Sequence, residues 1–277
     1  MRGQIIEINS DLHYVKSDKD IYPCKCRGIF RHEHIIPVVG DYVLFDEEKK
    51  IINEILDRNN SFDRPKVSNI DQAFIVTSVV QPNFSDNLLD KFIVLMEINR
   101  VKPIIVISKS DLVKDMSEYN NIFDYYKSIG YDVVFNYELD KIKKLLDNNV
   151  SVFVGQSGAG KSTLLNKLNP DFNIKTNEIS LSLGRGKHTT RVTKMYELFG
   201  GSVVDTPGFS ALSIINYSKE DIRSGFIEFK KYNCEYRDCF HINEKICGVK
   251  DAVISNNILK SRYENYLKFI GDDNNGS

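Results

Sequence analysis

The chain has 277 residues, a charged fraction of 27% and a formal net charge of −1. This length suits two or three domains, and the balanced charge means that any nucleic-acid contact must come from a local basic patch. Residues 1–4 do not begin a signal peptide, and no apolar run approaches the ~18 residues that span a membrane. We therefore expect a cytoplasmic protein with no membrane partner. Disulfides are rare in a reducing compartment, so we consider its five cysteines as candidate metal ligands rather than as disulfide partners.

Residues 1–63 predict a small all-β barrel. Apolar and polar residues alternate in short segments, separated by Gly, Pro, Asp and Asn, at 6–8, 22–26, 42–45 and 51–56. About five strands in this length are typical of an OB-fold. Several basic residues could make one face of the barrel positively charged: Arg27, Arg31, His32, His34, Arg58 and Arg64. Such a face could bind RNA, and an ordinary solvated surface fits these residues equally well.

Two cysteines of the barrel, Cys24 and Cys26, lie on the same face of one expected strand. We expect two buried thiols there. The alternative is a metal site completed by His32 and His34.

Residues 64–212 predict an α/β domain with a parallel sheet. Nearly continuous apolar strands alternate with helices. The strands are expected at 73–80, 103–107, 132–135, 150–154, 195–199 and 202–205, and the helices around 88–96, 118–129 and 138–147. Residues 213–277 predict a mainly helical third domain that contains a cluster of cysteines and a histidine.

A glycine-rich loop follows the expected strand 150–154 and leads into a helical apolar pattern. It reads Gly155-Gln156-Ser157-Gly158-Ala159-Gly160-Lys161-Ser162-Thr163, which matches the pattern G-x-x-x-x-G-K-S. Backbone N–H groups of such a loop surround phosphates, Lys161 adds a positive charge, and the Ser162 hydroxyl can bind Mg²⁺. This stretch predicts a nucleoside triphosphate site with Mg²⁺.

A second phosphate-linked motif, Asp205-Thr206-Pro207-Gly208, ends an apolar strand some 40 residues further on. Asp205 can hold Mg²⁺ through water, and the N–H of Gly208 can meet a γ-phosphate.

The choice of base is predicted by Ser108-Lys109-Ser110-Asp111, at the end of the strand 103–107. This segment is similar to the Asn-Lys-x-Asp guanine signature, with Ser108 in the Asn position. A carboxylate at Asp111 can accept from the N1–H and the amino group of guanine, whereas adenine would leave it unpaired. We therefore expect GTP rather than ATP.

The C-terminal cluster predicts a zinc site. Cys234, Cys239, His241 and Cys247 lie within fourteen residues and supply the four soft ligands of a closed tetrahedral centre. With no coordination position left for water, we expect one structural Zn²⁺. Free thiols or a redox pair are the alternative.

The order of the motifs points to a family. The guanine motif precedes the glycine loop, and Asp205-Thr206-Pro207-Gly208 comes last, which is a permuted order for a GTPase sheet. With a barrel before it and a Cys/His cluster after it, the chain resembles the ribosome small-subunit-dependent GTPases, the RsgA family. Further matches are the segments 58–65, 69–72 and 184–190. The chain departs from the family pattern in two places. Ser108 replaces the usual Asn, and the segment 134–137 lacks the Ser-Ala pair often seen in the last guanine-contacting loop.

The resemblance implies an OB-fold, a circularly permuted G domain and a zinc domain, acting late in maturation of the 30S subunit near the decoding region of 16S rRNA. It also implies that His188 assists catalysis and that Thr189 or Thr190 closes on Mg²⁺. Phe209 stands where Ras-like enzymes orient the attacking water with Gln, so hydrolysis should be slow without the small subunit. We expect a monomer that cycles between GTP and GDP.

Two other functions fit parts of the sequence. One is a P-loop ATPase or small-molecule kinase, which Asp111 disfavours. The other is a nucleotide-regulated RNA-binding protein with little turnover, which Phe209 keeps open.

Overall fold

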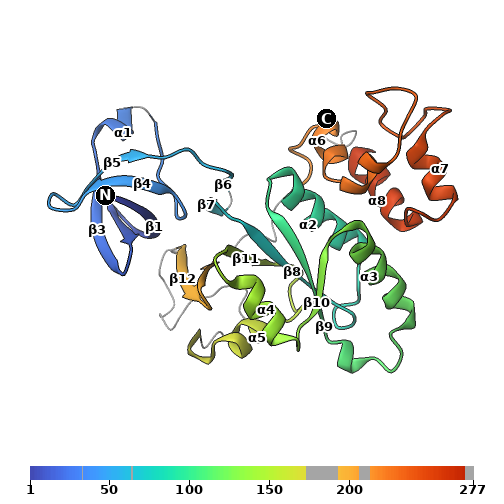
Figure 1. Cartoon of the computed structure of the whole chain (residues 1–277), viewed down its shortest axis with the longest axis horizontal. Helices are drawn as coiled ribbons and strands as arrows, with labels where there is room; N and C mark the ends of the chain where they lie inside the picture. Colours follow the sequence, from blue (N-terminus) through green and yellow to red (C-terminus); the bar gives the residue numbers. More distant parts are fainter. Residues whose placement is uncertain (33, 64, 173–192, 206–212, 272–277) are drawn as a thin grey trace. The chain divides into compact units, whose positions relative to one another are not determined.

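The computed structural model describes residues 1–32, 34–63, 65–172, 193–205 and 213–271, without the side chains of Arg31, Asp171 and Asp205. It forms two compact units. The first contains residues 1–73, 138–153 and 161–211, and the second contains residues 74–137, 154–160 and 212–277. The labelled elements are drawn in Figure 1.

The N-terminal part of the first unit is a five-stranded barrel. Its strands are β1 (Arg2–Asn9), β2 (Leu12–Ser17), β3 (Asp20–Cys26), β4 (Tyr42–Asp46) and β5 (Ile51–Ile55). They follow one another in the order β1-β2-β3-β5-β4, and β1 also pairs with β4, which closes the barrel. Every second residue of β2 is buried, as expected for a strand with one face in a core. The predicted barrel is confirmed, and a short helix, α1 (Ile29–His32), follows β3.

A hairpin follows the barrel, and the sequence pattern did not predict it. Strands β6 (Ser61–Asp63) and β7 (Lys66–Ser68) pair in antiparallel fashion. Each strand has only three residues, which is too short for a period-2 pattern to be recognised.

The first unit continues into an extended sheet in the order β11-β13-β12-β1, with β11 (Val150–Val154), β12 (Lys194–Leu198) and β13 (Gly201–Asp205). Strands β11 and β13 are parallel, as predicted. Strand β12 is antiparallel to β13, because Phe199 and Gly200 form a two-residue turn with φ of 50° and 79°, the geometry of a tight hairpin. Helices α4 (Leu139–Leu146) and α5 (Lys161–Leu168) belong to the same unit.

The second unit holds strands β8 (Gln72–Ser78, from Phe74 onward), β9 (Lys102–Ser108) and β10 (Asp132–Phe135), in the order β10-β9-β8. Strands β9 and β10 are parallel. Helix α2 (Asp86–Ile98) begins after Ser85, whose side chain accepts from the N–H of Leu88, a hydrogen bond that satisfies one free donor of the first turn. The short η1 (Ser110–Leu112) follows β9, and α3 (Ser117–Ile129) ends at Gly130 in a left-handed conformation. These elements agree with the predicted strand and helix alternation.

The C-terminal segment of the second unit consists of α6 (Lys219–Ser224), η4 (Ile227–Lys231), α7 (Gly248–Ile254) and α8 (Lys260–Gly271). Its core includes Val94 of α2 together with Phe226, Phe229, Tyr266 and Phe269. The predicted helical character is therefore present, and the segment shares its core with α2.

A buried ion cluster joins α8 to α2 and η4. Arg262 of α8 is fully buried and bonds with the carboxylates of Asp90 on α2 and Glu228 on η4. Tyr126 of α3 donates its hydroxyl to Asp90 at 2.5 Å. Burial raises the pKa of Asp90, and the guanidinium of Arg262 opposes that shift.

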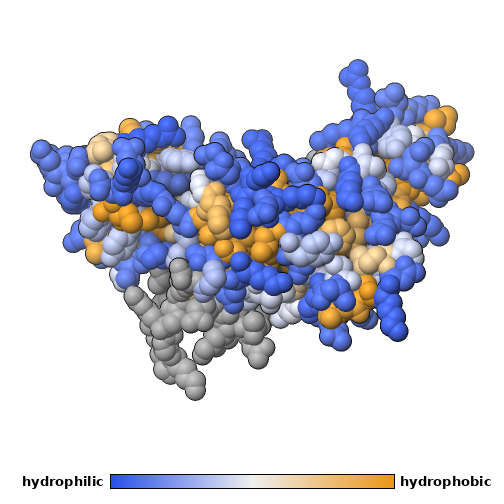
Figure 2. All heavy atoms as spheres, turned by 60° about the horizontal axis from the view of Figure 1, so that its bottom comes forward, coloured by the Kyte–Doolittle hydropathy of each residue, from blue (hydrophilic) through white to orange (hydrophobic). Residues whose placement is uncertain are grey.

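On the face shown in Figure 2, hydrophilic residues cover much of the described surface, and hydrophobic residues gather in separate patches. Exposed apolar side chains include Ile36, Ile215, Ile246 and Ile254. Within the described ranges, no helix combines the length and the apolar character needed to cross a membrane.

Candidate nucleotide and metal sites

The glycine loop follows β11 directly, and its first residue explains the need for glycine. Gly155 has φ of +136°, and a Cβ there would lie 2.2 Å from the carbonyl oxygen of Val76 on β8. No other residue fits so close to a neighbouring backbone. Helix α5 then begins at Lys161, and its residues Leu164, Leu165 and Leu168 are buried. The predicted order of strand, glycine loop and helix is present.

The Lys161 side chain is half-buried at the start of α5. Burial lowers the pKa of its ammonium group to about 8, because the charged form loses its hydration. A bound phosphate would favour the charged form again. The side chain is therefore suited to respond to an anion at this loop.

Ser108, at the end of β9, connects the guanine motif to the glycine loop. Its side chain is buried, and its hydroxyl lies 2.5 Å from the carbonyl oxygen of Ala159 and 3.3 Å from that of Thr77. A hydroxyl has one proton to donate, and the shorter distance assigns that proton to Ala159. The sequence placed Ser108 in the guanine motif, and the structure adds its contact with the phosphate loop.

The other residues of the guanine motif lie at the surface of the second unit. Lys109 adopts a left-handed backbone conformation with φ of 58°. This conformation is unfavourable in free energy for a residue with a side chain, so surrounding contacts must stabilise it. Its ammonium group donates to the carbonyl oxygen of Gln81. Asp111 lies in η1 and is exposed. The N–H of Asn136, in the segment after β10, donates to the carbonyl of Ile107 at 2.8 Å.

The loop between β8 and α2 is a part of this region that the sequence reading missed. Besides the contact of Gln81 with Lys109, the ring of Pro82 approaches the glycine loop: a Cβ at Gly158 would lie 3.6 Å from Pro82 Cδ. Ser78 donates its hydroxyl to the carbonyl of Pro82 at 2.7 Å. The signal in the sequence was a Pro two residues after the apolar run 73–80, which marks a turn but does not indicate what the turn contacts.

Several predicted site residues lie outside the described residues. These are His188, Thr189 and Thr190 in the segment 173–192, and Gly208 and Phe209 in the segment 206–212. The backbone of Asp205 is described as the last residue of β13, where it pairs with Lys194 of β12.

The four predicted zinc ligands come together. The sulfur of Cys247 lies 3.8 Å from those of Cys234 and Cys239, and His241 Nδ1 lies 3.3–3.4 Å from all three sulfurs. All four ligand atoms lie within 4.8 Å of one another. Ligands about 2.0–2.3 Å from a central zinc ion are about 3.5–3.8 Å apart in a tetrahedron. The donor set and its spacing fit one zinc ion.

The backbone around these ligands is held in place by neighbouring side chains. Glu244 accepts from the N–H groups of Phe240 and Ile242, on either side of His241. From α8, Tyr263 donates its hydroxyl to the carbonyl of His241, and Tyr266 donates to that of Phe240, both at 2.5 Å. Supports of this kind orient metal ligands in proteins.

The alternative metal site in the barrel is not supported. In the part of the chain that the structure describes, the C-terminal group is the one set of Cys, His, Asp and Glu residues close enough to hold a metal ion. Cys24 is buried and Cys26 is half-buried, close to the expected pair of buried thiols. The Cys26 sulfur lies 3.7 Å from the ring nitrogens of His13, and burial raises the pKa of Cys26 to about 11.

These features define a class. A glycine loop between a strand and a helix, with an Asp-bearing guanine motif earlier in the chain, describes a circularly permuted P-loop GTPase. The comparison with known families agrees: the RsgA GTPase model matches residues 55–215, and the RsgA N-terminal domain model matches residues 2–52. The chain belongs to the RsgA GTPase family and is a GTPase.

Similar proteins cover nearly the whole chain. Two are named small ribosomal subunit biogenesis GTPase RsgA. The protein from Streptococcus agalactiae serotype V is 43% identical, covering 98% of this chain and 95% of its own length. The protein from Streptococcus pneumoniae serotype 4 is 45% identical, covering 99% and 95%.

Two solved structures share the fold. One is described as YloQ, a circularly permuted GTPase, with a TM-score of 0.83 and 36% identity over 98% of this chain and 94% of the other. The second, YjeQ from Thermotoga maritima, has a TM-score of 0.84 and 34% identity, covering 98% of both chains. These comparisons confirm the permuted fold.

Proposed function

We propose that this GTPase acts in the maturation of the 30S ribosomal subunit and leaves the subunit when GTP is hydrolysed. The observation that carries this proposal is the nearly full-length similarity, at 42–45% identity, to proteins named for small-subunit biogenesis. Asp111 and the permuted motif order favour GTP over the ATPase and kinase alternative. The proposal includes 16S rRNA as a direct partner, a monomeric state and a cytoplasmic location.

The nucleotide is proposed to bind the glycine loop and the guanine motif. Backbone N–H groups of residues 155–163 surround the phosphates, Lys161 supplies a positive charge, and Asp111 pairs with the guanine edge. The Ser108 hydroxyl supports this arrangement through Ala159. The remaining proposed contacts are Gln156, Ser157, Gly158, Gly160, Thr163, Lys109, Ser110, Asp205 and Gly208.

Mg²⁺ is proposed to accompany GTP, with Ser162, Asp205 and either Thr189 or Thr190 as its partners. The ion neutralises the charge that develops between the β- and γ-phosphates. Carboxylate and hydroxyl oxygens are the ligands that Mg²⁺ prefers. His188 is proposed to position or deprotonate the attacking water, because Phe209 offers no polar group for that step.

One structural Zn²⁺ is proposed at Cys234, Cys239, His241 and Cys247. The sulfur and nitrogen spacings support a closed site. All four positions of a tetrahedral ion are then filled by the protein, so the metal stabilises the C-terminal segment rather than taking part in hydrolysis.

The three proposed domains are a barrel at 1–63, the permuted G domain at 64–212 and the zinc domain at 213–277. Contact with rRNA is proposed for exposed basic residues on the barrel and beside the zinc ligands: Arg27, His32, His34, Lys230, Lys231 and Arg237. Arg58 is removed from this set, because its guanidinium is paired inside the first unit. The side chain of Arg31 and the whole of Arg64, which belong to the same predicted basic face, lie outside the described residues.

One experiment tests the function. Hydrolysis of GTP and ATP is measured with purified protein alone, with 30S subunits and with 50S subunits as the control. We expect slow, GTP-specific turnover that rises with 30S subunits and not with 50S subunits. Equal GTP turnover in all three conditions would overturn the role on the small subunit, and ATP turnover would support the kinase or ATPase alternative.

A further inference from the structure

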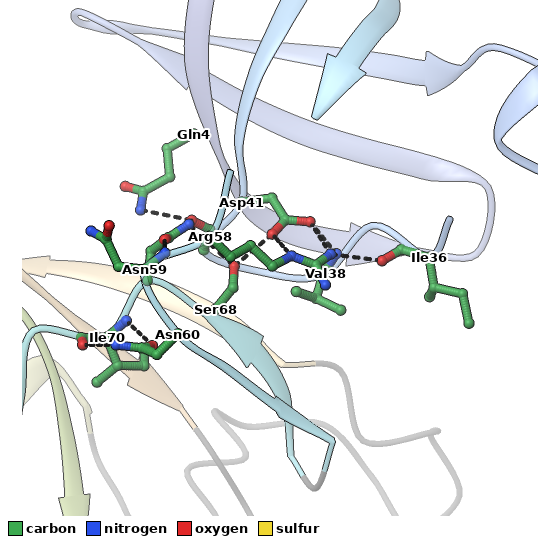
Figure 3. A network of polar contacts seen from close by, with 11 residues as sticks. Gln4, Ile36, Val38, Asp41, Arg58, Asn59, Asn60, Ser68 and Ile70 are labelled. Atoms are coloured by element: carbon green, nitrogen blue, oxygen red, sulfur yellow. Dashed lines mark hydrogen bonds and ion pairs between the residues drawn. The ribbon is translucent and has the colours of Figure 1, made fainter. Parts of the chain in front are cut away.

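A buried acidic side chain lies at the junction between the barrel and the hairpin β6–β7. Asp41, directly before β4, has no exposed surface. Its carboxylate accepts from Nε and one terminal nitrogen of Arg58 at 2.6 and 2.7 Å, from the hydroxyl of Ser68 at 2.6 Å and from the N–H of Val38 at 2.8 Å. Figure 3 shows Arg58 extended toward Asp41, with the hydroxyl of Ser68 directed at the same carboxylate. A buried carboxylate is stable only when it is paired in this way.

The guanidinium group of Arg58 forms hydrogen bonds with two segments at once. A terminal nitrogen that bonds Asp41 also donates to the carbonyl of Ile36 at 2.8 Å. Ile36 lies in the segment between α1 and β4, whereas Arg58 lies in the segment that leaves the barrel after β5. The planar guanidinium can make these bonds together, and the ammonium of Lys would be a single point of charge.

The hairpin side of the junction is fixed by amides and by close backbone packing. Asn69 donates to the carbonyl of Gly40 at 2.9 Å and accepts from the N–H of Asn59 at 2.9 Å. Gly40 has φ of +100°, and a Cβ there would lie 2.0 Å from the carbonyl oxygen of Ser68. Only glycine allows this approach of the barrel turn to β7.

Two residues after Asn69, a second set of bonds joins the chain to the strand that leads into the glycine loop. Asp71 exchanges two bonds with Val150 of β11, one from its own N–H at 2.9 Å and one to its carboxylate at 2.7 Å. Gln72 donates to the hydroxyl of Ser151 at 2.9 Å and to the carbonyl of Leu145 at 2.6 Å. Within the first unit, the hairpin is therefore bonded to the barrel, and the residues that directly follow the hairpin are bonded to β11 and to the carbonyl of Leu145.

We propose that Arg58 is a positioning residue that locks the barrel to β11, so that the barrel meets its RNA partner in one fixed orientation. The inference rests on the proposed function, because the barrel is proposed to bind the small subunit. Without the lock, the junction has to be ordered on binding, and that ordering opposes association. Arg58 touches neither nucleotide nor Mg²⁺ in the proposed site, so the chemistry alone should not depend on it.

The test compares full-length Arg58→Gln with wild type in two measurements. The first is GTP hydrolysis over a range of 30S concentrations. We expect an unchanged rate without subunits, an unchanged maximum, and about a tenfold higher concentration of subunits for half-maximal stimulation, as for a loss of preorganisation. The second is hydrogen exchange of the segment 57–71, which should become faster in the variant.

Two further variants keep the result interpretable. Lys102→Gln removes the same charge from an exposed pair with Asp132 and should leave both measurements unchanged. Asp41→Asn combined with Arg58→Gln removes both charges and leaves amides that can still bond, so this protein folds even if the single variant does not. It should still show faster exchange and the higher half-maximal concentration.

The outcomes separate the two proposals. Wild type without stimulation by 30S subunits overturns the proposed function, and the hydrogen exchange still decides whether Arg58 is the lock. Stimulation of wild type with an unchanged half-maximal concentration in folded Arg58 variants overturns the positioning role. Unchanged hydrogen exchange in the segment 57–71 of the Arg58 variants would show that Arg58 does not hold the barrel in place against β11.

Discussion

The hydroxyl of Ser108 donates to the carbonyl oxygen of Ala159 across 2.5 Å, so the end of the guanine-motif strand is bonded to the glycine loop. Ordinary guanine motifs have Asn at this position. A seryl hydroxyl makes the connection here with a shorter side chain, in a buried position.

Ser108→Ala should lower affinity for GDP by about tenfold, because a buried carbonyl loses its donor and the loop loses part of its preorganisation. Ser108→Thr keeps the hydroxyl and should retain more of the affinity. Titration with a fluorescent guanine nucleotide measures both. Ser68→Ala, an equally buried loss of a hydroxyl bond, is the control for general destabilisation and should bind GDP normally.

Asp111→Asn should reverse the base preference. The amide can no longer accept from both the N1–H and the amino group of guanine, and it offers a donor to the extra carbonyl of xanthine. We expect at least about a hundredfold loss of GDP affinity and a gain for XDP, measured by competition. Unchanged GDP affinity would exclude Asp111 from base recognition.

Nucleotide affinity should depend on pH through Lys161. Burial lowers its pKa to about 8, so the free protein loses this charge as pH rises past 8, whereas a bound phosphate favours the charged form. Binding above pH 8 then takes up a proton, and affinity falls by up to about tenfold per pH unit. Below pH 8 the amine is already charged and affinity should be nearly constant.

The matched variant for this profile is Lys161→Arg, which remains charged throughout. Its affinity for GDP should change less between pH 8 and 9 than that of wild type. Parallel profiles for the two proteins would show that another group causes the pH dependence.

Arg262→Met should destabilise the second unit by about 3–5 kcal/mol, because it leaves the carboxylates of Asp90 and Glu228 buried without their partner. Urea unfolding measures the change. Part of the loss should be recovered at acidic pH, because burial raises the pKa of Asp90 and favours its neutral form. Adding Asp90→Asn and Glu228→Gln should recover a further part. A loss below about 1 kcal/mol would match an exposed pair instead.

Cys239→Ser should abolish stoichiometric zinc and loosen the C-terminal segment, whose core includes Cys239 and Cys247. Elemental analysis gives the zinc content, and protease sensitivity after residue 213 reports the structure. Cys24→Ser is the control, because the barrel cysteine lies outside the group of metal ligands. Full zinc retention in Cys239→Ser would remove this residue from the ligand set.

The barrel shows which structural features a sequence pattern can predict and which it cannot. Alternation of polar and apolar residues predicted the strands around Tyr22–Cys26 and Tyr42–Phe45, because one-sided burial leaves a period of two. It did not predict that Arg58 turns inward to Asp41. An arginine in a polar segment looks the same in the sequence whether it faces solvent or a buried carboxylate 17 residues away.

The phosphate and metal motifs depend on local spacing, and the sequence by itself determined them. The proposed nucleotide motifs Gly155–Thr163 and Ser108–Asp111 and the four candidate zinc ligands are recognised by residue type and order, because each set lies within one short stretch. Only the tertiary structure decided which distant groups meet: Ser108 with Ala159, Arg58 with Asp41, and Arg262 with Asp90 and Glu228. Those pairs are selected by packing, since a buried polar group needs a partner wherever the chain brings one, and no local pattern records that choice.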